Sequence, residues 1–511
     1  MQKFIQYVLK NWHYLLFIFL LIVINFLCLY DHIMNHNFTV LFKSALIVFS
    51  VFAPIILCFI VKKLIKQQKA LQHIFLTIAV PLGCLYMIVL PMAGTPDEIA
   101  HYYRSYEISM GHITSKVEGE AGGRDFPVAI SSIFDQMKLD LTNIKYRDVL
   151  DSFRIRTDNS VTQFTNFTSS ALYSPLCYLP QATGVLVARL LHLPTAFTFY
   201  FGRIFNFIAF LAIVYFSIKW LPIKKISMIS ILFLPSVFQA AISLSPDALT
   251  IAISFALISF TFYMRDIKKG KMTNREFTIM SILALFISML KIVYLPICFL
   301  LFLIPKERFY SHREKYMKLG LLLMGIVGLN LGWLMYSSRF LIETNPGVNA
   351  VAQLEFILSS PISYVKILFD TLSTYYFVYL TTALGAQLGW LTINLNQSYV
   401  FSYFILLIFI FLTDQEKTRK KLQEFEKWWI FLLCCGIVLL IFTSLYIQWN
   451  AVRSELISGV QGRYFLPVVL LAVLLIDNHI KYNNRSNIKY YFSFAVFFNL
   501  YAIMECFLYH L

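Results

Sequence analysis

The residues best suited to chemistry lie in a short polar segment at positions 94–104. Asp97, His101 and Arg104 recur at i, i+4 and i+7, a spacing that places the three side chains on one face of a helix. A carboxylate held there suits removal of a proton from a hydroxyl group, and the imidazole or guanidinium suits orientation of that carboxylate or stabilisation of developing charge. The segment therefore provides four candidate catalytic residues: Asp97, Glu98, His101 and Arg104.

The same segment also fits an ordinary helix start. Thr95 is a natural N-cap, Pro96 suits the first helical position, and Thr95 with Glu98 makes a capping box. Acidic residues in a first helical turn are also favoured by the helix dipole. Spacing alone leaves the catalytic and the capping interpretations open.

Three further polar motifs each lie beside an apolar stretch. Asp247 ends a Ser-Pro-Asp motif, and Lys291, followed by Tyr294, separates two apolar half-spans. Arg463 and Tyr464 lie in the run Gln-Gly-Arg-Tyr-Phe-Leu-Pro near the end of the chain. Each motif has an ordinary alternative: a helix N-cap, a lysine that extends to the lipid headgroups, and an interfacial anchor.

Basic and aromatic residues in these motifs are candidates to hold a phosphate, because arginine matches phosphate geometry and a lysine between apolar segments needs an anion or a water-filled cavity. The candidate substrate- or phosphate-binding residues are Lys291, Tyr294, Arg453, Arg463 and Tyr464, together with the acidic Asp247. No cofactor is indicated with certainty. If a divalent metal is required, Asp97 and Asp247 would be its ligands.

The elements that must position these residues are membrane-spanning helices. The 511 residues are 59% hydrophobic and only 14% charged, too few charges to cover a water-facing surface. Apolar stretches of spanning length predict an all-α polytopic membrane protein with about 13 crossings. Two of these spans fall in residues 1–71, and the remaining spans form a membrane domain at 72–511, which contains a large loop at 93–197.

The basic residues predict the orientation of these spans. Clusters at 62–69, 265–275, 306–318 and 417–427 fall in alternate gaps between apolar stretches, as the positive-inside rule requires for cytoplasmic loops. All of these clusters can lie on the cytoplasmic side only if 171–191 and 361–382 do not cross the membrane and are interfacial or re-entrant segments. It places the N-terminus in the cytoplasm, and the C-terminus and every polar motif outside.

The ordered motifs resemble a known family. The strings PDEIAHYYRSYEIS, ALYSPLCYLPQATG, SLSPDAL, LKIVYLP and VQGRYFLP occur in that order. The chain resembles, from about residue 72 onward, a family of bacterial polytopic membrane proteins known mainly as a domain of unknown function and placed with the C-type (GT-C) glycosyltransferase superfamily. This resemblance implies a GT-C-like helical bundle that uses a polyprenyl-phosphate-linked sugar, with Asp97 as the catalytic carboxylate and Glu98 as the second choice. Asp247 matches the second acidic position, and Lys291 and Arg463 would hold the donor phosphate.

The resulting hypothesis is an inverting glycosyltransferase in the bacterial cytoplasmic membrane. It would move a sugar on the outer face to a cell-envelope glycopolymer or lipid. A transporter or flippase for a lipid-linked saccharide, and a non-catalytic envelope-assembly subunit, are the alternatives. Membrane lipid surrounds the protein in each case. No nucleic-acid partner is expected, because the basic clusters are short and tied to helix ends.

Overall fold

The computed structural model describes residues 2–35, 37–67, 70–119, 121–136, 144–155, 160–340, 347–414, 421–477 and 484–511. Parts of the predicted basic clusters, Lys69, Lys417, Arg419 and Lys420, lie outside these residues. The described chain is mostly helical and contains two small sheets.

The first half of the chain contains α1 (Gln2–Met34), α2 (Val40–Gln67), α3 (Leu71–Val89), α4 (Glu98–Ser109), β1 (Lys116–Glu118), β2 (Ala121–Pro127), α5 (Val128–Gln136), α6 (Tyr146–Ser152), β3 (Thr162–Asn166), α7 (Thr168–Ala171), η1 (Pro175–Tyr178), α8 (Leu179–Leu190), α9 (Thr195–Trp220), α10 (Lys225–Leu232), α11 (Pro235–Ile242) and α12 (Asp247–Phe262). The second half contains η2 (Tyr263–Ile267), α13 (Asn274–Leu290), η3 (Ile292–Leu303), η4 (Lys306–Arg308), α14 (His312–Ser337), η5 (Ser338–Phe340), α15 (Ala350–Ser359), α16 (Pro361–Leu384), β4 (Gln387–Leu388), β5 (Ile393–Asn394), α17 (Gln397–Thr413), α18 (Glu424–Trp449), η6 (Gly462–Phe465), α19 (Leu466–Leu475) and α20 (Asn484–His510).

The described residues contain eight helices that are long and apolar enough to cross a membrane, or up to ten if each bent helix pair counts as one span. This confirms a multi-pass membrane protein, whereas the expected 13 crossings are not confirmed. Several expected crossings are short here: η3, α17 and the segment Gly462–Leu475 are apolar but below spanning length, and α10 and α11 meet at 64°. A helix rises only about 1.5 Å per residue, so such segments need neighbours to complete a crossing of about 30 Å.

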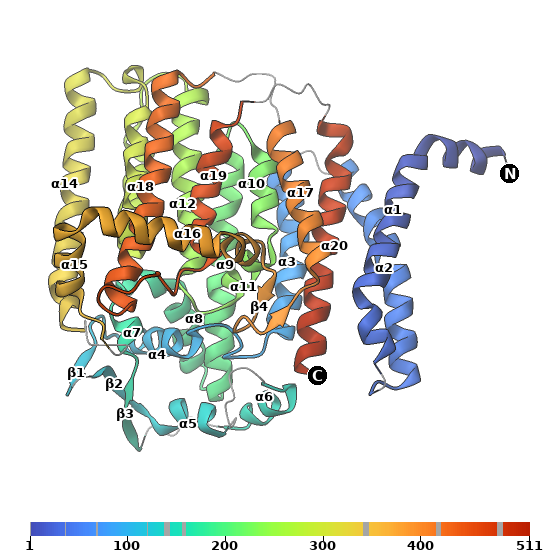
Figure 1. The fold of residues 1–511 in the computed structure, drawn as a ribbon, viewed down its shortest axis with the longest axis horizontal. Helices are drawn as coiled ribbons and strands as arrows, with labels where there is room; N and C mark the ends of the chain where they lie inside the picture. The colour runs from blue at the N-terminus through green and yellow to red at the C-terminus, as the bar shows by residue number, and fades with distance from the viewer. Residues whose placement is uncertain are drawn as a thin grey trace.

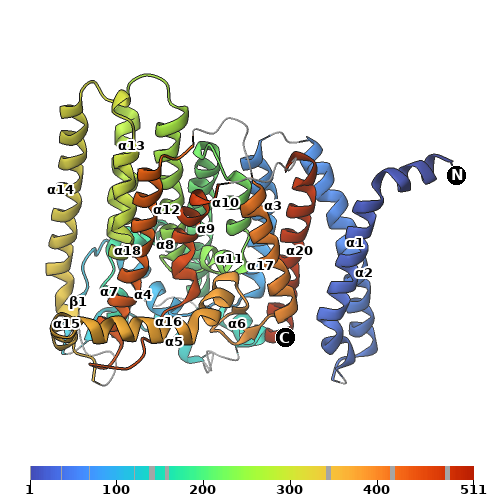
Figure 2. The ribbon, with the colours of Figure 1, turned by 45° about the horizontal axis from the view of Figure 1, so that its top comes forward.

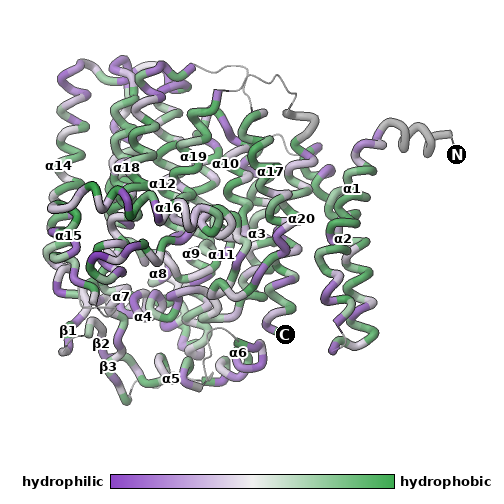
Figure 3. Tube along the Cα trace, viewed as in Figure 1, coloured by the Kyte–Doolittle hydropathy of each residue, from purple (hydrophilic) through white to green (hydrophobic). Residues whose placement is uncertain are grey.

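The upright helices have two chemically different ends (Figure 1). At one end, called the basic end, lie the connections that contain residues 263–273 and 304–311. At the other, called the loop end, lie α4–α7 and strands β1–β3. Figure 3 shows that the upright helices are mainly hydrophobic and that hydrophilic residues gather at both ends. Helix α4, which follows Asp97, lies at the loop end.

The two segments that were expected not to cross the membrane, 171–191 and 361–382, fold differently from each other. Residues 171–191 divide into the end of α7, the 3-10 turn η1 and the 12-residue helix α8, which at about 18 Å is too short to cross alone. Helix α16 has 24 residues but is bent by 106° from α15. In both orientations it lies across the upright helices (Figures 1 and 2). Its many exposed apolar side chains suit an interfacial helix.

The loop end carries a small module with its own core. Strands β1, β2 and β3 form an antiparallel sheet, and buried aromatic residues from β2, α4, α5 and α9 pack beside it. Glu107 of α4 lies inside this module, where Arg104 and Arg124 both donate to its carboxylate. Helix α4 is thus held between the module and the membrane helices.

A fully buried ion pair attaches the start of α4 to the bundle. The guanidinium of Arg203 on α9 donates from Nε and Nη2 to the Glu98 carboxylate at 2.8 and 2.6 Å. Arg203 also donates to the carbonyls of Leu90 and Pro91, and Glu98 Oε1 accepts from the backbone N–H of Leu244. One ion pair therefore joins the end of α3, the start of α4, helix α9 and the turn before α12.

We expect Glu98→Gln to destabilise the protein by about 3–5 kcal/mol, because it leaves the Arg203 cation buried without its counter-charge. The midpoint of thermal unfolding of the purified protein measures this loss. Exposed Glu118→Gln is the matched control and should change the midpoint little, and Glu98→Gln combined with Arg203→Met should recover part of the loss. Equal stability of the Glu98 and Glu118 variants would contradict the structural importance of the pair.

Candidate functional site

Three of the sequence-predicted residues form one charged centre, which comprises Asp247, Lys291 and Arg463. Lys291 Nζ lies 2.6 Å from Asp247 Oδ1, and Arg463 Nε donates to Asp247 Oδ2 at 2.8 Å. All three side chains are largely buried, with exposed fractions of 9%, 17% and 15% for Asp247, Lys291 and Arg463. Segments separated by more than 200 residues are thus joined through a single carboxylate.

The turn before α12 places Asp247 in this centre. Ser245 Oγ accepts from the Asp247 backbone N–H at 3.2 Å and so fixes the turn, whereas the N-cap position of α12 is occupied by Pro246 and no side chain caps the helix. Asn206 of α9 donates to the carbonyl of Ser243 at 2.7 Å, and Glu98 accepts from Leu244. With the backbone held in this way, the Asp247 side chain is left to bind the two cations.

Lys291 occupies the junction between α13 and η3. Because its ammonium group binds Asp247 and lies 4.6 Å from the centre of the Tyr464 ring, the alternative in which it extends to the lipid headgroups is wrong. Arg463 lies over the same ring at 5.5 Å, and Tyr294 OH donates to the Tyr464 carbonyl at 2.8 Å. Both sequence-predicted tyrosines therefore belong to this site.

The charged centre has a surplus positive charge. Two cations share one carboxylate, so the three side chains together carry about +1 when all are ionised. Among the described residues, the guanidinium of Arg463 makes one hydrogen bond, through Nε, and its two Nη groups make none. This leaves a planar pair of donors of the kind that binds phosphate or carboxylate oxygens.

Asp97 lies beside the centre in an unusual backbone conformation. It immediately precedes α4 and has a φ of 60°, in the left-handed region that is unfavourable for most residues. Asp97 keeps exposed surface, but the surrounding protein partly removes water from its carboxyl group, and this desolvation raises the pKa of Asp97. Arg463 and Lys291 lower the same pKa, and Asp247 raises it further.

His101, one turn further along α4, also faces the centre but is buried. Its Nδ1 lies 2.8 Å from Tyr178 OH, and its ring packs against Tyr173 and Tyr178. Burial lowers the pKa of His101 to about 3, with Lys291 acting in the same direction and Asp247 in the opposite one. The imidazole is therefore neutral at physiological pH and can position a neighbour by hydrogen bonding, without adding charge.

The other two candidate catalytic residues point elsewhere. Glu98 is fully buried against Arg203, so the predicted capping box with Thr95 is wrong; α4 starts after Asp97 without a side-chain cap. Arg104 is fully buried and binds Glu107, Ser115 Oγ and the carbonyl of Ile113. Both act on the framework around the site.

Arg453 is separated from Arg463 despite their proximity in sequence. The backbone N–H of Arg453 donates to Gln353 Oε1, and its exposed side chain lies over Phe356 of α15. Gly462, by contrast, is essential to the position of Arg463. A Cβ atom there would lie 2.0 Å from the Tyr379 carbonyl oxygen, so the backbone of η6 approaches the backbone of α16.

Sequence reasoning missed two tyrosines and the partner of one arginine, Arg203, which was expected only to add to a basic rim at the outer face. Tyr173 and Tyr178 lie against His101, and Arg203 binds Glu98. The tyrosines belong to ALYSPLCYLP, a polar and aromatic interruption of an apolar stretch, and this feature could have indicated their role. Arg203 lies near the start of a spanning helix, where a cation requires a partner, and Glu98 could have been considered as that partner.

The side chains around Asp97 and Asp247 can be compared with the ligands that a divalent metal ion would need. Within the described ranges, no group of three or more His, Cys, Asp and Glu side chains is arranged to hold a metal ion. Asp97 and Asp247 interact electrostatically, but both oxygens of Asp247 are engaged by cations. The arrangement favours an anion beside the two cations over a divalent cation between the two carboxylates.

The fold and the site define a polytopic membrane protein with a largely buried, cation-rich centre next to an exposed carboxylate. The chain belongs to the family described as Predicted membrane protein (DUF2142), which matches residues 80–472. No curated protein and no solved structure matches the chain. The matched region contains the whole charged centre and Asp97, whereas α1, α2 and α20 lie outside it.

We expect Asp97→Asn to raise stability at neutral pH. The folded-state pKa of Asp97 lies above its usual value of 3.8, so its ionisation destabilises the folded state as pH rises through that window. Asparagine cannot ionise, and it also tolerates the left-handed conformation. Thermal unfolding should show a gain at pH 7.5 that shrinks as pH falls towards 4. A lower midpoint at neutral pH, or a gain independent of pH, would contradict the environment assigned to Asp97.

Proposed function

We propose that this protein is a membrane glycosyltransferase that binds the phosphate of a polyprenyl-phosphate-linked sugar at the charged centre. The observation that carries the proposal is the position of an exposed carboxylate, Asp97, beside two cations that share one buried carboxylate. A base next to an anion site is the combination that transfer of a sugar from a phosphate leaving group requires.

Charge balance supports a phosphodiester as the ligand. The centre carries about +1, and a sugar linked through a single phosphate to a lipid carries about −1, so the two compensate. The Nη groups of Arg463 and the remaining protons of Lys291 would donate to the phosphate oxygens. Because both side chains are largely buried, this attraction is screened much less than a surface ion pair.

Asp97 would act as the general base. The acceptor hydroxyl gives its proton to the Asp97 carboxylate while its oxygen bonds to the anomeric carbon of the donor sugar. The bond from that carbon to the phosphate oxygen breaks on the opposite face, which inverts the configuration. The polyprenyl phosphate leaves with an additional negative charge, and Lys291 and Arg463 stabilise it. A pKa raised towards the working pH improves a carboxylate as a base.

His101 and the framework residues would support this chemistry indirectly. The neutral imidazole, fixed by Tyr178, would orient Asp97 or the acceptor. Glu98 and Arg203 would fix the start of α4 relative to the turn before Asp247. The ordered sequence motifs resemble a family placed with the GT-C superfamily, and this resemblance supports the same reaction class.

The cellular setting follows from the charge pattern. If the basic end faces the bacterial cytoplasm, as the positive-inside rule favours, the loop end and the site would lie on the outer face of the cytoplasmic membrane, with the N-terminus inside and the C-terminus outside. The acceptor would be a cell-envelope glycopolymer or lipid. Transport of a lipid-linked saccharide is less well supported, because helix α12 carries no charged residue between Asp247 and Arg265 to continue a polar path.

We expect Asp97→Asn to lower sugar transfer by roughly 10²- to 10⁴-fold with a small change in the KM for the donor, because it removes a base and leaves the cations. Transfer of a radiolabelled sugar from polyprenyl phosphate, assayed with purified protein, measures this. Full activity of Asp97→Asn would end the assignment, and movement of the lipid-linked saccharide across sealed vesicles without transfer would favour the transport alternative.

Arg463→Gln and Arg453→Gln form a matched pair. Both arginines are candidate phosphate ligands by sequence, but only Arg463 lies in the charged centre. We expect Arg463→Gln to raise the donor KM by roughly tenfold or more, because it removes a charge-assisted contact to phosphate. Arg453→Gln should alter the KM by less than about threefold, as expected of an exposed residue outside the charged centre. Equal effects of the two variants would show that the centre does not bind the donor phosphate.

A further inference from the structure

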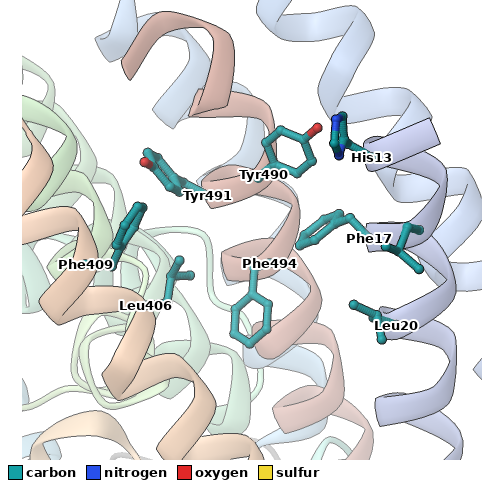
Figure 4. Close-up of a pocket in the computed structure, with 9 residues that line it drawn as sticks. His13, Phe17, Leu20, Leu406, Phe409, Tyr490, Tyr491 and Phe494 are labelled. Carbon is teal, nitrogen blue, oxygen red and sulfur yellow. The ribbon is translucent and has the colours of Figure 1, made fainter. Parts of the chain in front are cut away.

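A groove of about 540 Å³ lies between α1 and α17, with residues of α20 between them (Figure 4). Its apolar lining includes Phe17 and Leu20 of α1, Leu406 of α17 and Phe494 of α20. Figure 4 shows polar groups at one end, where His13 and Tyr490 lie near each other, and apolar side chains along the rest. The groove is therefore amphipathic along its length.

Two lysines lie close to the tyrosines at the polar end, although neither lines the groove itself. Lys62 also donates to Asn11 Oδ1 at 3.1 Å. Lys62 Nζ lies 5.2 Å and Lys489 Nζ 4.9 Å from the centre of the Tyr14 ring. Lys489 also lies 5.0 Å from the ring of Tyr490, which borders the groove and packs edge-on against Tyr14 at 5.3 Å. Two cations are thus brought to one aromatic cluster, and an anion close to both would reduce their repulsion.

The surroundings of the groove are those of a lipid interface. Leu20 is 49% exposed and Leu16, which also lines the groove, is 47% exposed, on a helix long and apolar enough to span the membrane. Trp12, half-exposed beside His13, is a residue type enriched where a helix leaves the hydrocarbon. Lys62 is in the last two turns of α2 and Lys489 in the second turn of α20, both at the basic end.

We propose that this groove binds an anionic glycerophospholipid. Its phosphate lies near Lys62 and Lys489, and one acyl chain follows Phe17, Leu20 and Phe494 between the helices. Charge complementarity selects the acidic headgroup, and the apolar length of the groove selects a molecule with a hydrocarbon tail. A free phosphate ester would satisfy only the polar end.

The bound lipid would fasten the N-terminal hairpin to the bundle. Direct contacts between α1–α2 and α20 include Tyr14 OH with Ser493 Oγ at 3.2 Å and His32 Nε2 with Glu505 Oε2 at 3.0 Å. The lipid fills the groove between these helices and α17. Helices α1, α2 and α20 lie outside the family match at 80–472, and only α17 contributes lining residues from within it. The groove contains no residue of the charged centre, so the proposal does not depend on the proposed transfer reaction.

The test uses the full-length protein and native mass spectrometry after titration with phosphatidylglycerol or phosphatidylcholine of the same acyl chains. We expect one phosphatidylglycerol to be retained in preference to phosphatidylcholine, and Lys62→Gln with Lys489→Gln to weaken its binding by roughly tenfold or more. Lys66→Gln, which removes an exposed charge from the same helix α2, is the matched control and should retain binding.

A second variant tests the apolar part of the groove without changing charge. Leu20→Trp would fill the acyl-chain path and should reduce phosphatidylglycerol retention while the protein keeps its unfolding midpoint. Equal retention of both lipids, equal loss with Lys66→Gln, or full competition by glycerol phosphate would overturn the proposal. If the lysine pair fails to fold, the result with Leu20→Trp decides: full retention of phosphatidylglycerol overturns the site and a selective loss supports it.

Discussion

The arrangement of the site depends on one interaction, the buried pair of Glu98 and Arg203. Each charge is costly inside a membrane protein, so the pair is stable only because every strong donor and acceptor finds a partner. Arg203 satisfies two carbonyls at the end of α3, and Glu98 accepts from the turn before α12. The positions of Asp97 and Asp247, which come from different parts of the chain, are consequently set by the same two side chains.

The charged centre follows the same physical rule with a different outcome. Asp247 compensates Lys291 and Arg463 only in part, and the Nη donors of Arg463 make no hydrogen bond among the described residues. A fully compensated cluster would serve stability alone. An incompletely compensated one, held rigidly at low dielectric, is what a site needs to attract an anion and to respond when more negative charge develops on it.

Much of this could be predicted from sequence, since composition and apolar length identify a polytopic helical membrane protein and the polar motifs identify Asp97, Asp247, Lys291 and Arg463. Spacing could not assign the roles of Glu98 and Arg104, because helical periodicity gives a face but no partner. Glu98 binds an arginine 105 positions away, and Arg104 binds a loop that folds back over α4. The predicted number of crossings stays unconfirmed, because apolar segments such as η3, α17 and Gly462–Leu475 are shorter than a full span, and sequence does not show how neighbouring helices complete such a crossing.

The contact between Gly462 and α16 has a mechanical consequence. The missing side chain lets η6 lie directly on the backbone of α16, and the Gly462 N–H donates to Thr382 Oγ1 at 3.1 Å. Helix α16 lies across the upright helices with many apolar side chains exposed, which suits a helix at the bilayer interface. Arg463, one residue beyond Gly462, is therefore linked to α16 as well as to Asp247, and a displacement of α16 would be transmitted to the cation.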